Sequence, residues 1–136
     1  EMCIRDRSTR VAMQDGESRG SHVFLDYLNY SSPSKDEGDW MLSLLRDCVR
    51  ESGIREVHSH VEIFDGSESP PGFAAVILID ESHVTAHCYS EEGLLAIDVF
   101  TCGPHDPELV VGLIHEGLTS QIDGVTLVRK ERFSRF

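Results

Sequence analysis

The sequence predicts an α+β fold, a two-layer sandwich in which two helices cover one face of an antiparallel sheet. Two stretches carry apolar residues at spacings of three and four, as amphipathic helices do, and about six short segments have the alternation or the apolar runs of strands. Short turns separate the middle strands, which is typical of antiparallel neighbours. The predicted order is strand, helix, four strands, helix, strand.

The first strand is expected at residues 22–28, which are rich in β-prone apolar side chains. A helix follows, with Ser34 or Asp36 capping its start and Gly53 its end. Its apolar stripe consists of Trp40, Met41, Leu44, Leu45, Cys48 and Val49. This stripe predicts that the helix packs on the sheet.

Four strands are expected next, at residues 57–64, 73–79, 84–89 and 94–100. The run 73–79 is apolar throughout, as in a central strand covered on both faces. Pro107 opens the second helix, whose apolar stripe comprises Val110, Leu113, Ile114, Gly117 and Leu118. The last strand is expected at residues 125–129.

At 136 residues the chain suits one domain, placed at residues 21–136. Residues 1–20 are polar and without pattern, and we interpret them as a disordered or non-native leader. The formal net charge of −12 argues against nucleic acid and anionic membranes and favours a cationic small molecule. Neither a membrane-spanning segment nor a dense disulfide pattern is present, so we expect a cytoplasmic protein.

Three side chains have the chemistry of a reaction centre. Ser82 follows a polar break between two apolar strands, where a strained turn would expose its hydroxyl and the preceding carbonyl. His87 lies five residues later, and Cys102 ends the next strand. Hairpin pairing is expected to bring all three to one end of the sheet as nucleophile, base and acid.

Two segments resemble the short prokaryotic S-adenosylmethionine decarboxylases. That family carries E-S-H-x-x-x-H-x-W-P-E and D-V-F-T-C-G, which match residues 81–91 and 98–103 here. The likeness extends from His22 to about Arg129. The resemblance implies a homodimer, or a dimer of cleaved-chain pairs, with a four-layer αββα arrangement and sites near the interface.

The resemblance implies a self-processing proenzyme that is cleaved between Glu81 and Ser82. The Ser82 hydroxyl attacks the preceding carbonyl, and elimination then converts Ser82 into a pyruvoyl group, the cofactor. This ketone forms a Schiff base with the substrate amine and accepts electrons as carbon dioxide leaves. By the same likeness, His87 assists proton removal during processing and Cys102 returns a proton to the α-carbon.

The implied substrate is S-adenosylmethionine, whose decarboxylated form is the aminopropyl donor for spermidine. Phe64 matches an aromatic residue that stacks on the substrate, Tyr89 a tryptophan, and Glu91 a glutamate that binds ribose hydroxyls. The chain departs from the family pattern at Tyr89-Ser90, in a longer loop before Gly72, and at Ala74 in place of a serine. The last change is expected to slow self-cleavage.

Three other interpretations stay open from the sequence. The altered pocket allows an L-ornithine or L-arginine decarboxylase on the same scaffold, and Ala74 allows a non-processing homologue that only binds a partner. A metal-binding module is the third, although no C-x-x-C pair supports it and we predict no metal site. The residues available to it are His58, His60, His83, His87, His105, Cys88 and Cys102.

Overall fold

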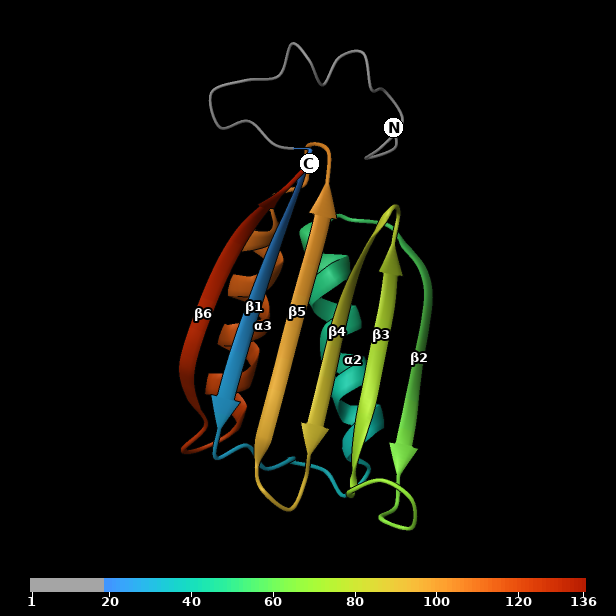
Figure 1. Cartoon of the computed structure of the whole chain (residues 1–136), viewed down its shortest axis with the longest axis vertical. Helices are drawn as coiled ribbons and strands as arrows, with labels where there is room; N and C mark the ends of the chain where they lie inside the picture. Colours follow the sequence, from blue (N-terminus) through green and yellow to red (C-terminus); the bar gives the residue numbers. More distant parts are fainter. Residues whose placement is uncertain (1–18) are drawn as a thin grey trace.

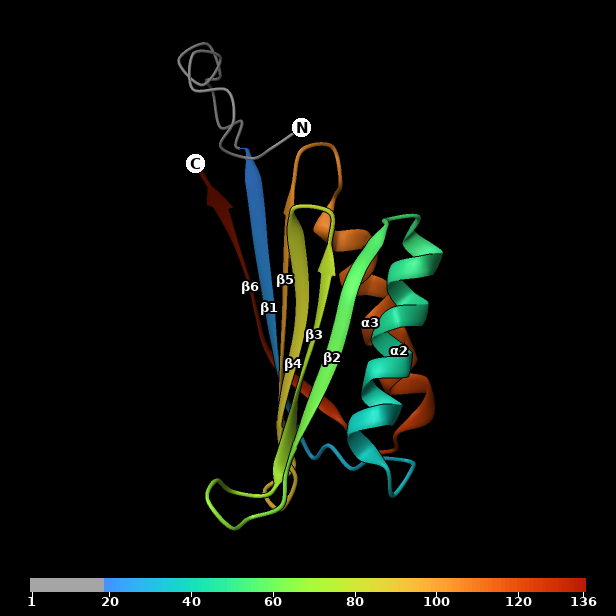
Figure 2. The same ribbon diagram turned by 90° about the vertical axis from the view of Figure 1, so that its right-hand side faces the viewer.

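The computed structural model describes residues 19–136 and has the predicted two layers, with six antiparallel strands in the order β2-β3-β4-β5-β1-β6 (Figure 1). Both helices lie on one face of the sheet, and no helix of residues 19–136 covers the other face (Figure 2). The predicted order of elements is confirmed. The elements are β1 (Gly20–Leu28), α2 (Glu37–Ser52), β2 (Glu56–Phe64), β3 (Gly72–Ile79), β4 (Ser82–Tyr89), β5 (Leu94–Cys102), α3 (Pro107–Gln121) and β6 (Thr126–Arg135).

The hydrophobic core lies between the helices and the sheet. From α2 it takes Met41, Leu45, Cys48 and Val49, and from α3 Val110, Ile114 and Leu118. Alternate strand residues, such as Val23, Ile77 and Ile97, are fully buried against these stripes. The side chains between them therefore point to the helix-free side, which we call the open face.

The helix ends agree with the sequence except at one cap. Gly53 ends α2 with a left-handed φ of 84°, and Pro107 begins α3 behind Asp106, whose carboxylate accepts a hydrogen bond from the Glu108 N–H. Asp36 precedes α2, but its side chain makes no capping hydrogen bond. The Ser34 hydroxyl instead accepts a hydrogen bond from the Asp36 N–H, so the predicted side-chain cap of α2 is wrong.

Several strands are longer than predicted. β4 begins at Ser82, β5 runs to Cys102, and β6 reaches Arg135, because backbone pairing continues where the side chains are polar. The expected leader, residues 1–20, lies outside the described residues up to position 18, and Gly20 already pairs with Cys102 in the sheet. Within residues 19–136, no helix is long and apolar enough to cross a membrane.

Candidate active site

A two-residue turn presents the Glu81–Ser82 peptide bond at one end of the sheet. Ile79 pairs with Ser82, so only Asp80 and Glu81 connect β3 to β4. Asp80 has a φ of 51°, a left-handed conformation that costs a residue with a side chain about 1 kcal/mol. The backbone strain expected from the sequence is present, and it lies one residue before the bond.

Ser82 and Cys102 meet at this end of the sheet. The two strands are antiparallel, and β4 begins where β5 ends. Ser82 is only 8% exposed, so the expectation of an exposed hydroxyl is wrong, and its Oγ accepts a hydrogen bond of 3.0 Å from the backbone N–H of Cys102. Cys102 is buried and takes part in a disulfide bond, which the spacing of the cysteines did not predict. Its thiol can act as an acid only after reduction of that bond.

Side chains from two other segments hold the turn. Arg55 Nε donates a hydrogen bond of 3.0 Å to Asp80 Oδ1, and His105 Nε2 lies 3.7 Å from Asp80 Oδ2. His105 is fixed in turn, because its carbonyl accepts a hydrogen bond of 2.9 Å from Thr101 Oγ1. The strained residue before the Glu81–Ser82 bond is thus anchored on two sides.

His87 lies away from this cluster. The five residues that separate it from Ser82 along a strand correspond to about 17 Å. An odd separation also reverses the face: Ser82 is buried on the helix side, whereas His87 is exposed on the open face. The expectation that one chain brings Ser82, His87 and Cys102 to the same end of the sheet is therefore wrong, because β4 is continuous between the first two.

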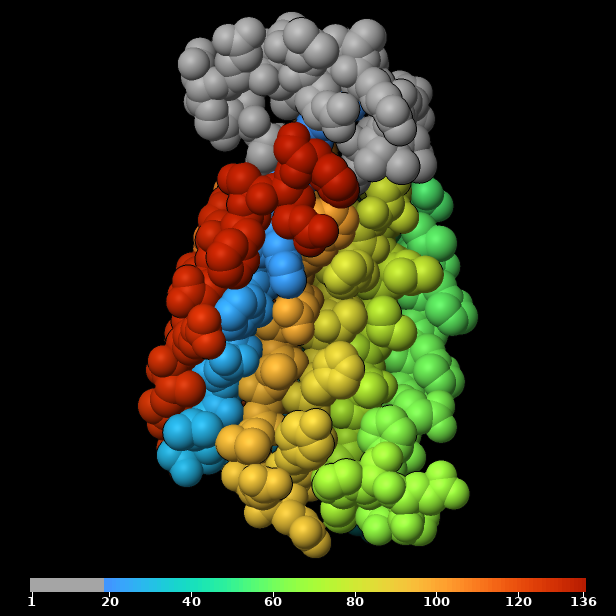
Figure 3. Space-filling view, in the orientation of Figure 1, coloured from blue at the N-terminus to red at the C-terminus, as the bar shows by residue number. Residues whose placement is uncertain are grey.

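The expected aromatic residues of the substrate site lie near His87, towards the end of β4. Strand register places Phe64, Gly72 and Tyr89 in one row of the open face, shown from the front in Figure 3. The Phe64 and Tyr89 side chains are 36% and 49% exposed. A depression of about 240 Å³ between them is lined by Phe64, Ser69, Pro70, Phe73, His87, Cys88 and Tyr89. Glu91 is exposed in the adjacent turn between β4 and β5.

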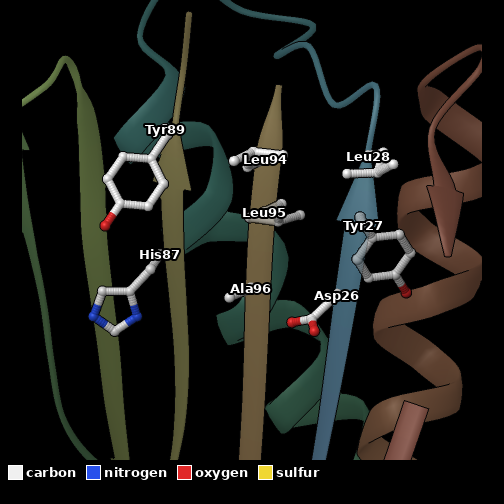
Figure 4. A pocket seen from close by; sticks show the side chains of 8 residues that line it. All are labelled: Asp26, Tyr27, Leu28, His87, Tyr89, Leu94, Leu95 and Ala96. Atoms are coloured by element: carbon white, nitrogen blue, oxygen red, sulfur yellow. The ribbon is translucent and has the colours of Figure 1, made fainter. Parts of the chain in front are cut away.

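A second depression of about 240 Å³ lies on the other side of His87 and Tyr89 (Figure 4). β1 contributes Asp26, Tyr27 and Leu28 to it, and β5 contributes Leu94, Leu95 and Ala96. The sequence did not single out Asp26, although its position two and four residues from Phe24 and His22 places all three on the same strand face. This alternation is the sequence signal that could have placed Asp26 on the open face.

The departures from the family pattern lie beside His87. Ala74, which replaces the expected serine, pairs directly with His87 on the open face. Gly72 is required by packing, since a Cβ there would lie 1.9 Å from the Cys88 carbonyl oxygen. The Cys88 thiol is buried, which raises its pKa to about 11, so it stays protonated at neutral pH as a core side chain.

Burial also affects His83, on the open face near Ser82. Its ring lies 5.6 Å from that of Phe100, centroid to centroid, and partial burial lowers its pKa. The charge of nearby His22 lowers it further. Among residues 19–136, no three His, Cys, Asp or Glu side chains gather as a metal site would require.

Comparisons with known proteins agree with the resemblance found at residues 81–91 and 98–103. The family model described as S-adenosylmethionine decarboxylase matches residues 21–130. The S-adenosylmethionine decarboxylase proenzyme of Geobacillus kaustophilus is 33% identical over 107 residues, which are 77% of this chain and 82% of that protein. The corresponding proenzyme of Anoxybacillus flavithermus is 32% identical over the same shares of the two chains.

Among solved structures, the adenosylmethionine decarboxylase from Aquifex aeolicus has the same fold. Its TM-score is 0.69 at 23% sequence identity, over 88% of this chain and 92% of that one. The family match runs from the second residue of β1 to the middle of β6 and includes both helices and the Glu81–Ser82 turn. This chain belongs to the S-adenosylmethionine decarboxylase family.

Proposed function

We propose that this chain is a proenzyme that cleaves itself between Glu81 and Ser82 and then decarboxylates S-adenosylmethionine with the resulting pyruvoyl group. The family match over residues 21–130 carries the proposal. The local geometry supports it, because the Ser82 hydroxyl is held at the first residue of β4, next to the peptide bond it would attack. A buried serine after a strained turn fits a cofactor made from the chain itself.

Self-cleavage begins when Ser82 Oγ bonds to the carbonyl carbon of Glu81. The carbon–nitrogen bond breaks, the hydroxyl proton passes to the nitrogen, and an ester joins the two parts of the chain. A base then removes the α-proton of Ser82, and the carbon–oxygen bond breaks to leave a carboxylate on Glu81. Dehydroalanine at position 82 tautomerises, and water replaces its nitrogen as ammonia, which leaves the ketone.

We assign the base to His87 of a second copy of the chain. Two copies that pack by their open faces around a twofold axis normal to the strands run their β4 strands in opposite directions. The first residues of β4 in one copy then face its last residues in the other, near His87. Large apolar side chains on the open face support such packing: Leu28, Phe64, Leu78, Tyr89 and Phe133 are all at least 36% exposed.

This arrangement is a four-layer αββα homodimer with two sites. Ser82 lies at a strand end, and cleavage makes it the first residue of its fragment. It is then no longer held by a preceding residue, which allows it to turn from the helix side towards the interface. Cys102, with its N–H already on Ser82 Oγ, is placed to return a proton to the product carbon once its thiol is reduced.

The remaining roles follow the positions of the side chains. Phe64 and Tyr89 present aromatic surfaces to the adenine ring and the sulfonium group, and Glu91 accepts hydrogen bonds from ribose hydroxyls. The pyruvoyl ketone supplies the electron sink for loss of carbon dioxide. The product would be the aminopropyl donor for spermidine synthesis, and the need for a reduced Cys102 fits the cytoplasm.

Intact-mass measurement tests the processing step. We expect two fragments, residues 1–81 and 82–136, and the second should gain the mass of two hydrogen atoms with borohydride because it begins with a ketone. A single uncleaved mass after long incubation under reducing conditions contradicts the proposal and favours a non-processing homologue. Carbon dioxide release should then be measured with S-adenosylmethionine, L-ornithine and L-arginine. Activity confined to the last two would overturn the substrate assignment.

A further inference from the structure

Asp26 lies opposite His87 on the open face. Both residues pair with Ala96 of β5, Asp26 from β1 and His87 from β4, so the three side chains form one row across the sheet. Figure 4 shows the Asp26 carboxylate directed over β5, towards the side on which His87 and Tyr89 lie. The row therefore has a carboxylate at one end and an imidazole at the other.

The space between them is left open by Ala96. Adjacent strands lie about 4.8 Å apart, so the Asp26 and His87 backbones are about 10 Å apart with one methyl group between. This gap forms part of the depression of about 240 Å³. Leu28, Leu94 and Tyr89 line the rest of its outer part, and Asp26 is its one carboxylate. The pocket is thus apolar with a single negative charge on its wall.

The side chains around Asp26 do not neutralise it. Among residues 19–136, no side chain forms a hydrogen bond or ion pair with its carboxylate. Arg129 pairs with Asp26 across β1 and β6, but Arg129 Nε donates to Glu131 and its guanidinium lies 5.1 Å from the Phe24 ring centre. A half-buried carboxylate without a partner attracts a cationic ligand.

We propose that Asp26 is a specificity-determining residue whose carboxylate binds the positively charged sulfonium of the substrate. This inference rests on the proposed function, since it concerns the same pocket. The α-amine of the substrate must reach the ketone, so the sulfonium is the positive charge left for the pocket wall. Tyr89 contacts it from the other side with an aromatic ring.

The test compares a charged ligand with a neutral one. S-adenosylhomocysteine is the thioether that lacks the S-methyl group and the positive charge. Asp26→Asn should raise the KM for S-adenosylmethionine about tenfold, with a small change in kcat, and leave inhibition by the thioether unchanged. Asp26→Glu should retain most of the discrimination. Asp123→Asn is the matched control, because Asp123 is exposed, lies outside the pocket and removes the same charge.

Salt provides a second readout. The KM of the unchanged protein should rise with sodium chloride, and that of Asp26→Asn should not. Equal weakening of both ligands would show that Asp26 only shapes the pocket, and an unchanged KM would overturn the inference outright.

The closing measurement separates this inference from the proposed function. The affinities for S-adenosylmethionine and S-adenosylhomocysteine should be measured by calorimetry in an uncleavable Ser82→Ala chain, with and without Asp26→Asn. Preference for the sulfonium that disappears with Asp26→Asn supports the inference even if the wild-type protein fails to decarboxylate. Equal affinity for both ligands in the Ser82→Ala protein refutes it even if the wild-type protein is active.

Discussion

Two inactive variants should restore each other if the site is shared between two copies. A Ser82→Ala chain cannot form the ketone, and a His87→Ala chain lacks the proposed base. In a mixed dimer, Ser82 of the His87→Ala chain faces His87 of the other chain, so one complete site forms. The second site of the same dimer carries both substitutions and stays inactive.

The yield follows from random pairing. Equal amounts of the two chains give about half mixed dimers, so about half of the His87→Ala chains should be cleaved. Each mixed dimer has one working site of two, which predicts about a quarter of the wild-type activity. The chains should be co-expressed or refolded together, and intact mass identifies which of the two is cut.

Two results would refute the shared site. Cleavage of His87→Ala alone at the wild-type rate removes the proposed role of His87. A mixture no more active than the two variants measured separately, in a sample shown to contain mixed dimers, places the complete site within one chain. A complete site within one chain would require β4 to rearrange, because Ser82 and His87 are about 17 Å apart along that strand.

Three further outcomes are expected. Gly72→Ala should lower the free energy of unfolding by about 2 kcal/mol or more in urea titrations, because the new Cβ would lie 1.9 Å from the Cys88 carbonyl oxygen. The control is Gly112→Ala, in open space on α3, which should raise the free energy of unfolding by about 0.5–1 kcal/mol. An equal loss for both would contradict the steric reason. Burial lowers the pKa of His83, so the unfolded chain binds a proton more readily than the folded one, and stability falls as pH drops through about 6.5. In thermal melts, His83→Gln should reduce this fall between about pH 7.5 and 5.5. An unaltered pH profile of stability would count against this role of His83. Asp80→Asn keeps a residue that tolerates φ > 0 but removes the ion pairs of the turn with Arg55 and His105. The rate of self-cleavage, measured by intact mass, should therefore fall about two- to fivefold. An unchanged rate would show that these ion pairs do not position the Glu81–Ser82 bond.

The predicted fold followed from hydrophobic periodicity, and its errors lie where that signal is absent. Alternation and, at residues 73–79, a continuous apolar run identified the inner strands, because these strands have a face that packs on helices. β6 is an edge strand whose residues after Val128 are almost all polar, so only its pairing with β1 defines its length. Backbone hydrogen bonds do not depend on side-chain type, which is why the strand continues to Arg135.

The candidate site was half predictable. A short turn between antiparallel strands places the start of β4 beside the end of β5, which brings Ser82 to Cys102. The position of His87 was also open to prediction, because an odd number of residues along a strand always reverses the face. The contacts of Asp80 with Arg55 and His105 were not, since they join segments whose proximity depends on the complete sheet.

The odd spacing between Ser82 and His87 links maturation to assembly in the proposed function. A residue placed an even number of positions from Ser82 would share its face and could not project into the interface with a second sheet. A residue at an odd number of positions from Ser82 does project into the interface. The five-residue separation also places the imidazole towards the end of β4, where the oppositely directed β4 of a partner begins. A chain that needs its partner's imidazole cannot form the ketone before it pairs, so its reactive group appears only inside a site that is already enclosed.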